Sequence, residues 1–326
     1  MTRRGLQITL GVLWLVDASL QFQPAMFGGR LVTEVLSPAG DGQASFVSRP
    51  VEHVAHLVSG HPALFNAAFA SVQLAIGVGL LLRRPVVLAL FASIVWALAV
   101  WYLGEGLGGL TGPNAALLTG APGAALLYAA LAAGAWPRAA SDHPEPPPAA
   151  WLAFVWAAYW VGGAILQLWH GPRTGPDLAA TIGESANGAP GWLSRFDFTI
   201  ARNAGHVGAA VLDGFVALQV LTGLAVFAPA QFRKSAAAVG TLISCGFWII
   251  GGGFSQLLSG HATDPGTAPL VIVLALAIST RHAAKTGTPI GAGRPPQRVL
   301  SNRPSRLRPG PLYRPRRISR TVRRTR

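Results

Sequence analysis

The chain is poor in charge, cysteine and lysine, and each shortage excludes a class of protein. Only 12% of its 326 residues are charged, 51% are apolar, and the mean hydropathy is +0.42. A soluble protein of this length needs more charge to cover its surface, so the composition predicts a membrane protein. Cys245 lies in an apolar segment, and because it is the one cysteine of the chain, an intrachain disulfide is excluded. Only two of the 26 basic residues are lysines, which indicates a GC-rich, bacterial genome.

The net charge of +14 belongs mainly to the C-terminal end. Twelve arginines lie between Arg294 and Arg326, and residues 286–326 are also rich in proline. This composition predicts a disordered tail that keeps the C-terminus in the cytoplasm. The sharper alternative is binding to anionic lipid head groups. Nucleic acid fits poorly, because Tyr313 is the only aromatic residue of the tail that could stack on a base.

An internal repeat organises the rest of the chain. Residues 14–22, WLVDASLQF, match residues 160–168, WVGGAILQL, at a displacement of 146 positions. The same displacement places residues 46–49, FVSR, on residues 192–195, WLSR. A fixed displacement over this length indicates a duplicated membrane protein.

Eight apolar segments are long enough, or nearly so, to cross a bilayer, whose core needs about 20 apolar residues per helix. They cover residues 6–22, 62–82, 85–103, 115–136, 149–169, 204–230, 235–258 and 267–282. Four segments per copy is an even number, so both copies enter the membrane in the same direction. We therefore expect an all-α polytopic protein of two tandem four-helix modules in parallel orientation. The expected domains are a first module at 1–137, a proline-rich cytoplasmic linker at 138–148, a second module at 149–285 and the tail at 286–326.

The distribution of basic residues between the loops predicts the orientation. With the N-terminus inside, nine basic loop residues fall on the cytoplasmic side and five fall outside, before the tail is counted. The outer loops also hold eight acidic residues. We expect a multi-pass protein of the bacterial cytoplasmic (inner) membrane, with both termini in the cytoplasm.

The first outer loop of each copy is long, covering roughly residues 23–61 and 170–203, and a loop of this length is usually functional or partly folded. Its FVSR or WLSR segment is amphipathic and is expected to lie at the membrane interface. Trp192 then belongs to the interfacial aromatic belt, while Arg49 and Arg195 extend toward the head groups.

Three carboxyl groups fall inside or at the end of expected membrane helices, where a charge costs about 2.5–3.5 kcal/mol. They are Asp17, Asp213 and Glu105, and none aligns with an acidic residue of the other copy. One interpretation is a proton or cation pathway in one asymmetric site. The other is a set of protonated or hydrogen-bonded carboxyls that fix helix packing.

Polar amides are also paired across the two copies. The four glutamines expected within the membrane are Gln21, Gln73, Gln167 and Gln219. Hydrogen bonds between helices, worth about 0.6 kcal/mol each, are the interpretation we prefer for them.

Four histidines are the candidates for a metal or haem ligand. His53 and His56 share one face if their segment is helical, and His61 and His206 each follow a glycine before the second helix of their copy. No HxxxH or CxxC pattern accompanies them, and histidines are also common at membrane interfaces. Haem, a metal ion or a quinone therefore remain open as cofactors.

Two stretches resemble a known family. Residues 72–98, VQLAIGVGLLLRRPVVLALFASIVWAL, look like the second and third helices of the DoxX-like membrane proteins, and residues 218–239 resemble them again. The shared feature is a helix with a polar residue and glycines, followed by a tight basic turn and an alanine-rich helix. The resemblance covers about a third of the chain and implies a four-helix bundle, in a family of which some members are linked to quinone-dependent sulfur oxidation.

Three classes of function follow. The DoxX-like segments, the tryptophans and the histidines favour a membrane redox or quinone-interacting protein. The duplicated halves with Asp17, Asp213 and Glu105 favour a small-solute or proton-coupled transporter. A non-enzymatic assembly or scaffold protein requires only the packing features. The sequence does not decide whether the chain is an enzyme, and the bilayer is the one partner that it predicts.

Overall fold

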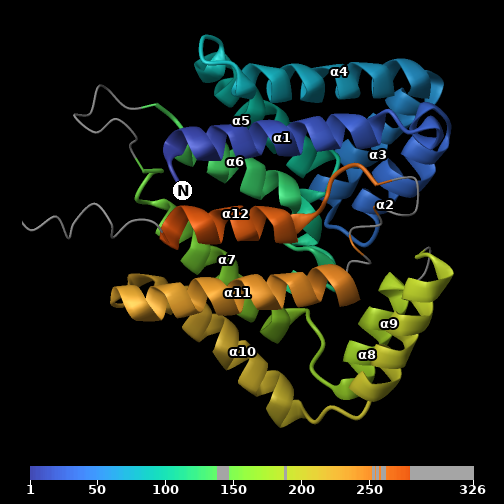
Figure 1. Cartoon of the computed structure of the whole chain (residues 1–326). Coiled ribbons are helices and arrows are strands. Elements are labelled where there is room, and N and C mark those ends of the chain that lie inside the picture. The colour runs from blue at the N-terminus through green and yellow to red at the C-terminus, as the bar shows by residue number, and fades with distance from the viewer. Residues whose placement is uncertain (138–146, 187–188, 252–253, 255–256, 258–261, 280–326) are drawn as a thin grey trace, which may run out of the picture. The chain divides into compact units, whose positions relative to one another are not determined.

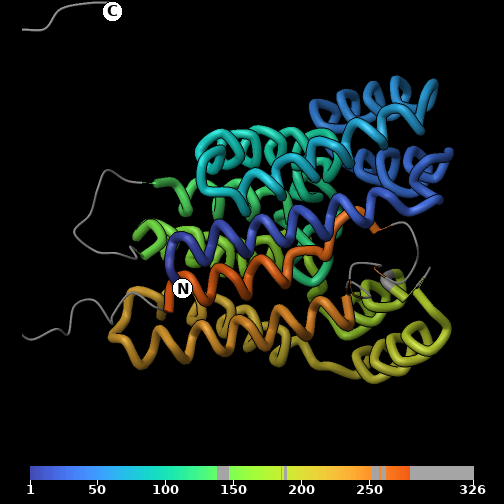
Figure 2. Tube along the Cα trace, turned by 45° about the horizontal axis from the view of Figure 1, so that its top comes forward, coloured from blue at the N-terminus to red at the C-terminus, as the bar shows by residue number. Residues whose placement is uncertain are grey.

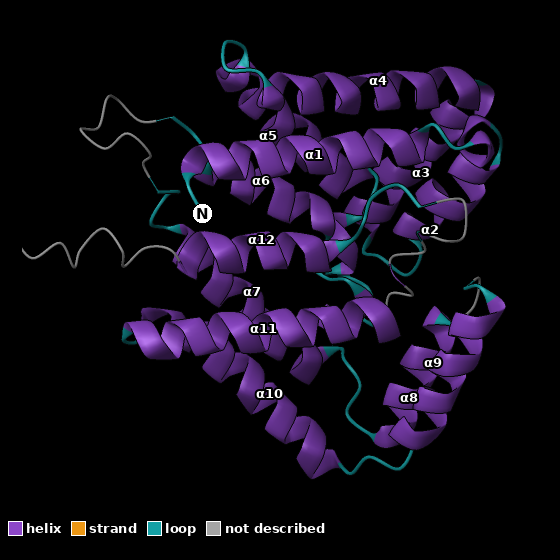
Figure 3. Cartoon of the chain, viewed as in Figure 1, coloured by secondary structure: helices purple, strands orange, loops and turns teal. Residues whose placement is uncertain are grey.

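The computed structural model describes residues 1–137, 147–186, 189–251, 254, 257 and 262–279. Within these residues the chain is helical and has no strands (Figure 3). The α-helices are α1 (Arg3–Gln21), α2 (Ser37–Gly40), α3 (Ser45–Gly60), α4 (Pro62–Leu81), α5 (Val86–Leu103), α6 (Ala124–Gly134), α7 (Leu152–Trp169), α8 (Gly175–Ser185), α9 (Gly191–Ala204), α10 (Ala209–Leu224), α11 (Ala230–Ile250) and α12 (Thr267–Ser279). Short 3-10 or π turns lie at Pro24–Phe27, Leu31–Leu36, Leu107–Gly109, Leu117–Thr119 and Ala225–Phe227.

Four helices are long and apolar enough to cross a membrane. They are Pro62–Leu81, Val86–Leu103, Leu152–Trp169 and Ala209–Phe227. The all-helical prediction and the membrane prediction are therefore confirmed at this level. The full set of eight spans stays a prediction.

Two of the expected spans form shorter helices than predicted. The segment 115–136 becomes the 11-residue α6, and the segment 267–282 becomes the 13-residue α12 within the described residues. At 1.5 Å per residue these helices are about 16 and 20 Å long, shorter than a bilayer core of about 30 Å. A Gly-Ala-Pro-Gly run at 120–123 starts α6 late, because proline and left-handed glycines do not continue a helix.

The two long loops that the sequence predicts at 23–61 and 170–203 contain helices, as their length suggested. The first contains α3, whose buried residues Val47, Val51, Ala55 and Val58 recur at helical spacing and form its inner face. The second contains α8 and α9, which pack against each other. Thr174 starts α8 with a capping box, in which its hydroxyl accepts the N–H of Asp177.

The helices pack in corresponding pairs, α1 with α4 and α7 with α10, then α5 with α6 and α11 with α12 (Figure 1). Gly77 permits the close approach of α4 to α1, because a Cβ there would lie 2.8 Å from Leu15. Gly223 has the same role beside α7, where a Cβ would lie 3.0 Å from Val161. Helix α12 lies between α1 and α11 in both views (Figures 1 and 2).

Hydrogen bonds show which helix ends lie together. Arg4 Nη1 donates to the carbonyl of Leu80 at 2.9 Å, and Gln7 Nε2 donates to the carbonyl of Ala135 at 3.0 Å. The start of α1 therefore lies beside the ends of α4 and α6. The end of α1 lies beside the start of α4, where Asn66 Nδ2 donates to the carbonyl of Gln21 at 2.8 Å.

Buried aromatic residues form the centre of this helical unit. Trp14 Nε1 donates to Ser93 Oγ and Trp156 Nε1 donates to the carbonyl of Thr222, each at 2.9 Å. Close contacts define residues 1–286 as one unit. Most of the expected linker 138–148 and the whole expected tail 286–326 lie outside the described residues.

Candidate acidic membrane site

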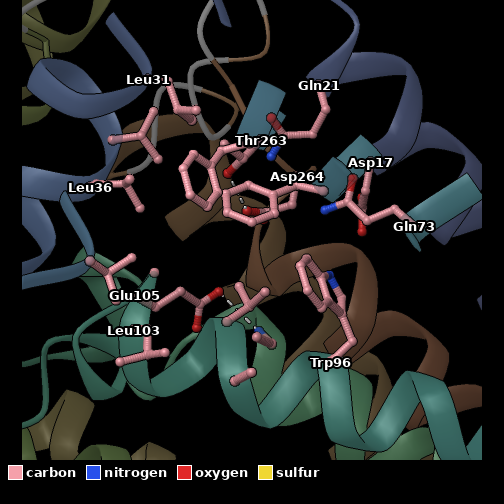
Figure 4. Close-up of a pocket in the computed structure, with 18 of the residues that line it drawn as sticks. Asp17, Gln21, Leu31, Leu36, Gln73, Trp96, Leu103, Glu105, Thr263 and Asp264 are labelled. Atoms are coloured by element: carbon pink, nitrogen blue, oxygen red, sulfur yellow. Dashed lines mark hydrogen bonds between the residues drawn. The ribbon is translucent and has the colours of Figure 1, made fainter. Parts of the chain in front are cut away.

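A cavity of about 310 Å³ lies in the first half of the chain, between α1, α3, α4, α5 and α6. We call it the acidic cavity, because Asp17, Glu105 and Asp264 line it (Figure 4). Its remaining wall is mostly apolar, and its aromatic residues are Trp14, Phe65, Phe69, Trp96 and Tyr128. Apolar walls with a few converging polar groups are the usual composition of a small-molecule site.

Asp17 reaches the acidic cavity from the last third of α1. Its side chain is 1% exposed, and its Oδ1 has no hydrogen-bond partner. The hydroxyl of Tyr128 on α6 lies next to this carboxyl group. In Figure 4 Asp17 lies beside Gln73 on one side of the cavity.

Glu105 lies on the opposite side, two residues beyond the end of α5 (Figure 4). Its Oε1 accepts the N–H of Ala125 in the first turn of α6 at 3.0 Å, while the buried Oε2 has no partner. Burial, followed by the nearby charge of Asp264, raises the pKa of Glu105 to about 8, although the N–H groups of α6 act in the opposite direction. Glu105 is therefore mostly protonated at neutral pH.

Asp264 comes from the other half of the chain, in the turn before α12, and completes the acidic cavity. Its Oδ1 accepts the N–H of Gly266 at 2.7 Å, and its Oδ2 accepts the hydroxyl of Thr263 at 3.0 Å. Burial raises the pKa of Asp264, and these two hydrogen bonds oppose the shift. Sequence reasoning missed this residue, because Asp-Pro-Gly reads as an ordinary turn.

The glutamines behave differently in the two halves. Gln21 and Gln73 are each 5% exposed, line the acidic cavity, and have an Oε1 without a hydrogen-bond partner. In the second half, Gln219 Nε2 donates to Gln167 Oε1 at 2.5 Å, which is the interhelical bond that we expected. Gln219 Oε1 also has no hydrogen-bond partner. Among the described glutamines, however, only Gln21 and Gln73 line the acidic cavity, where their free oxygens are available to a ligand.

A second cavity of about 480 Å³ adjoins the first. We call it the glycine-lined cavity, because Gly108, Gly109, Gly120, Gly123, Gly251 and Gly266 line it. Glu105 and Asp264 line both cavities. The N-terminal ends of α6 and α12 also line it, so the irregular backbone that precedes these two helices borders a polar space.

Asp213 does not join the other two predicted carboxyls. It lies near the start of α10, its side chain is 62% exposed, and its Oδ1 is 4.0 Å from Nη2 of Arg173. An exposed pair of this kind contributes little to stability. The predicted set of three is thus divided, with Asp17 and Glu105 in one cavity and Asp213 outside it.

The predicted interfacial residues lie on exposed helix faces. Arg49 on α3 and Arg195 on α9 are exposed, and Arg195 Nε donates to the carbonyl of Gly191 at 3.0 Å. Trp192 on α9 is also exposed.

The four candidate histidines are exposed as well. His53 and His56 lie on α3, His61 joins α3 to α4, and His206 lies between α9 and α10. Over the described residues, no group of three or more His, Cys, Asp or Glu side chains converges as metal ligands. The histidines therefore lie apart from the acidic cavity and line none of the cavities described here.

Comparison of the chain with protein-family models, with curated proteins and with solved structures finds no significant match.

Proposed function

We propose that the chain is a DoxX-like membrane protein of two tandem four-helix modules, with eight membrane helices and parallel halves. Of these eight, the short α6 and α12 cross only part of the bilayer core. The two stretches that resemble this family coincide with α4–α5 and α10–α11. Each consists of two helices joined by a short turn, as the resemblance implies. The corresponding helix pairs of the two halves are further support.

A third cavity, of about 430 Å³, supports the duplication most strongly. It lies in the second half, and much of its lining stands 146 positions after lining residues of the acidic cavity. Corresponding residues of the two cavities are Gln21 and Gln167, Leu36 and Ile182, Val54 and Ile200, Val58 and Ala204, Phe65 and Val211, and Phe69 and Phe215. We call this third space the apolar cavity, because none of the described residues that line it carries a carboxyl group.

The two halves also exchange a loop segment. Thr263 and Asp264 of the second half line the acidic cavity, and Leu117 and Leu118 of the first half line the apolar cavity. These residues again stand 146 positions apart. Such a reciprocal exchange is what a pseudo-two-fold axis between the halves produces. Over the described residues, carboxyl groups line the first of the two equivalent cavities and not the second.

The proposed orientation has both termini in the cytoplasm of a bacterium, in its inner membrane. The start of α1 and the end of α4 lie together, and this end carries Arg3, Arg4, Arg83 and Arg84. A cluster of arginines at one end favours the cytoplasmic side. Contact between the Arg-rich segment and anionic lipid is part of the same proposal.

We propose that the acidic cavity binds a lipid-soluble small molecule with carbonyl oxygens, of the quinone class. The observation that carries this proposal is a cavity with aromatic walls in which carboxyl and amide groups converge without sufficient partners. The aromatic side chains suit a flat apolar ring, which they can stack against. A protonated Glu105 and the amide of Gln73 can donate hydrogen bonds to carbonyl oxygens on opposite sides of the ring.

A quinone-binding measurement tests this function with a matched control. A short-chain ubiquinone analogue is titrated into purified protein, and tryptophan quenching gives the Kd. Gln73→Leu removes a donor from the acidic cavity and should raise the Kd about fivefold to tenfold, because one hydrogen bond is worth about 1 kcal/mol. Gln219→Leu changes the equivalent residue of the second half and should leave the Kd unchanged. Equal effects of the two variants would refute binding in the acidic cavity.

Proton-coupled transport is the second candidate, and one observation favours it. Glu105 and Asp264 line two adjoining cavities, as residues along a pathway would. Vesicles that contain the protein should then show flux of a small lipophilic solute that depends on the pH gradient and is lost in Asp17→Asn. Flux that is equal in wild type and variant would remove this candidate. Failure of both tests would leave an assembly or scaffold role.

A further inference from the structure

The acidic cavity and the glycine-lined cavity meet at two carboxyl groups. Glu105 and Asp264 are the only ionisable residues that line both of these spaces within the described part of the chain. On one side of them lies a cavity with mostly apolar walls, which contains Asp17. On the other side lies a cavity bordered by glycine backbone, Gln43 and Thr119, where water finds polar partners.

The hydrogen bonds of Glu105 leave one oxygen available for proton exchange. Its Oε1 is occupied by the N–H of Ala125, but its buried Oε2 has no partner. Gly123 allows this arrangement, because a Cβ at that position would overlap Oε2. Asp264 is held within its own turn by Gly266 and Thr263, which fixes the orientation of its carboxyl group in that turn.

In the described part of the chain, no basic residue lines the space around these carboxyl groups. The ionisable groups facing the acidic cavity are Asp17 from α1, Tyr128 from α6, Glu105 after α5 and Asp264 before α12. Over the described residues, no lysine, arginine or histidine lines either cavity. Like charges so close together cannot all ionise, so the group shares protons among its members.

We propose that Asp264 and Glu105 form a proton relay that connects the glycine-lined cavity with Asp17 in the acidic cavity. The relay rests on the proposed function, since it would deliver protons to the space that the ligand occupies. A hydronium ion that reaches the water of the glycine-lined cavity gives its proton to the bridging carboxyl that is ionised, and it leaves as water. The proton then passes through the other bridging carboxyl to the carboxylate of Asp17, and both bridging carboxyls return to their starting state. One proton moves in each step, and no electron is transferred.

Hydrogen–deuterium exchange of the protonated carboxyl of Asp17 tests the relay without any ligand. Infrared spectroscopy of the reconstituted protein after mixing with D₂O follows the carboxylic-acid band, which is assigned by its loss in Asp17→Asn. The relay predicts that Glu105→Gln and Asp264→Asn each slow this exchange at least about tenfold, because a side chain without a titratable proton cannot pass one on. Asp213→Asn, an exposed carboxyl outside both cavities, should exchange at the wild-type rate.

A second variant keeps the test valid if a carboxyl variant does not fold. Ala39 lines the glycine-lined cavity, so Ala39→Phe fills part of this space while all three carboxyls remain. The relay predicts slower exchange here too. An unchanged rate in Ala39→Phe and in the carboxyl variants would overturn it. Quinone titrations on the same samples separate the two proposals. If the variants slow exchange of the Asp17 carboxyl but the protein does not bind quinone, the relay is supported and quinone binding is refuted.

Discussion

Replacement of Glu105 by glutamine should change how the stability of the protein depends on pH. Glu105→Gln keeps an oxygen that can accept the N–H of Ala125, but the side chain no longer ionises. In the wild-type protein the pKa of Glu105 is raised from 4.5 to about 8, because the carboxylate is buried and close to Asp264. The folded protein therefore retains a proton that the unfolded chain releases at a lower pH.

The direction and size of the effect follow from this difference. Between pH 4.5 and about 8 the folded state binds more protons than the unfolded state, so the free energy of unfolding falls as the pH rises through that window. Each pKa unit corresponds to about 1.4 kcal/mol, so the shift sets an upper bound of about 5 kcal/mol. Glu105 is only partly shielded from the glycine-lined cavity, where water weakens the effect, so we expect roughly 2–4 kcal/mol.

Thermal unfolding in mild detergent, measured at several pH values, gives the required comparison. The wild-type protein should lose stability as the pH rises toward about 8, and Glu105→Gln should lose distinctly less. Glu52→Gln, an exposed glutamate on α3, is the matched control and should follow the wild-type curve. Parallel curves for Glu105→Gln and wild type would show that Glu105 is not forced to keep its proton in the folded state.

Three glycine substitutions give further predictions from the same measurement. Gly123→Ala should destabilise the protein by about 2–4 kcal/mol, because the φ of +98° at this position is unfavourable for alanine and the new Cβ would overlap Glu105 Oε2. A loss of stability below about 0.5 kcal/mol would contradict the described start of α6. Gly240→Ala on α11 places a Cβ 2.5 Å from the ring of Trp156 and should cost about 1–3 kcal/mol. Gly246→Ala on the same helix meets open space and should stabilise by up to about 1 kcal/mol, so equal effects of these two variants would contradict the described packing of α11.

The sequence predicted helices well where hydrophobicity alone determines them. The expected segments 62–82, 85–103 and 149–169 agree with α4, α5 and α7 to within about three residues. The late start of α6 was missed, because residues 115–123 are apolar enough to extend the predicted span. The glycines and the proline of this stretch interrupt the helix, but they do not alter its hydropathy pattern.

The candidate site was predicted in part for a similar reason. Asp17 and Glu105 attracted attention because a carboxyl in an apolar helix is costly, and the structure brings them together. Asp213 fulfilled the same criterion, but its side chain is exposed near the start of α10. The sequence pattern does not reveal how far a side chain is buried. Asp264 reaches the site only because the two halves exchange loop segments, a tertiary relation without a local sequence signal.

Photolabelling with a light-activated quinone analogue tests the central claim most directly. The label is activated on the reconstituted protein, and modified residues are located by mass spectrometry, with and without excess unlabelled quinone. Residues of the acidic cavity, such as Phe69, Trp96 and Tyr128, should carry labels that excess quinone suppresses. Labels spread over exposed faces of the helices, or labels that excess quinone does not reduce, would contradict it.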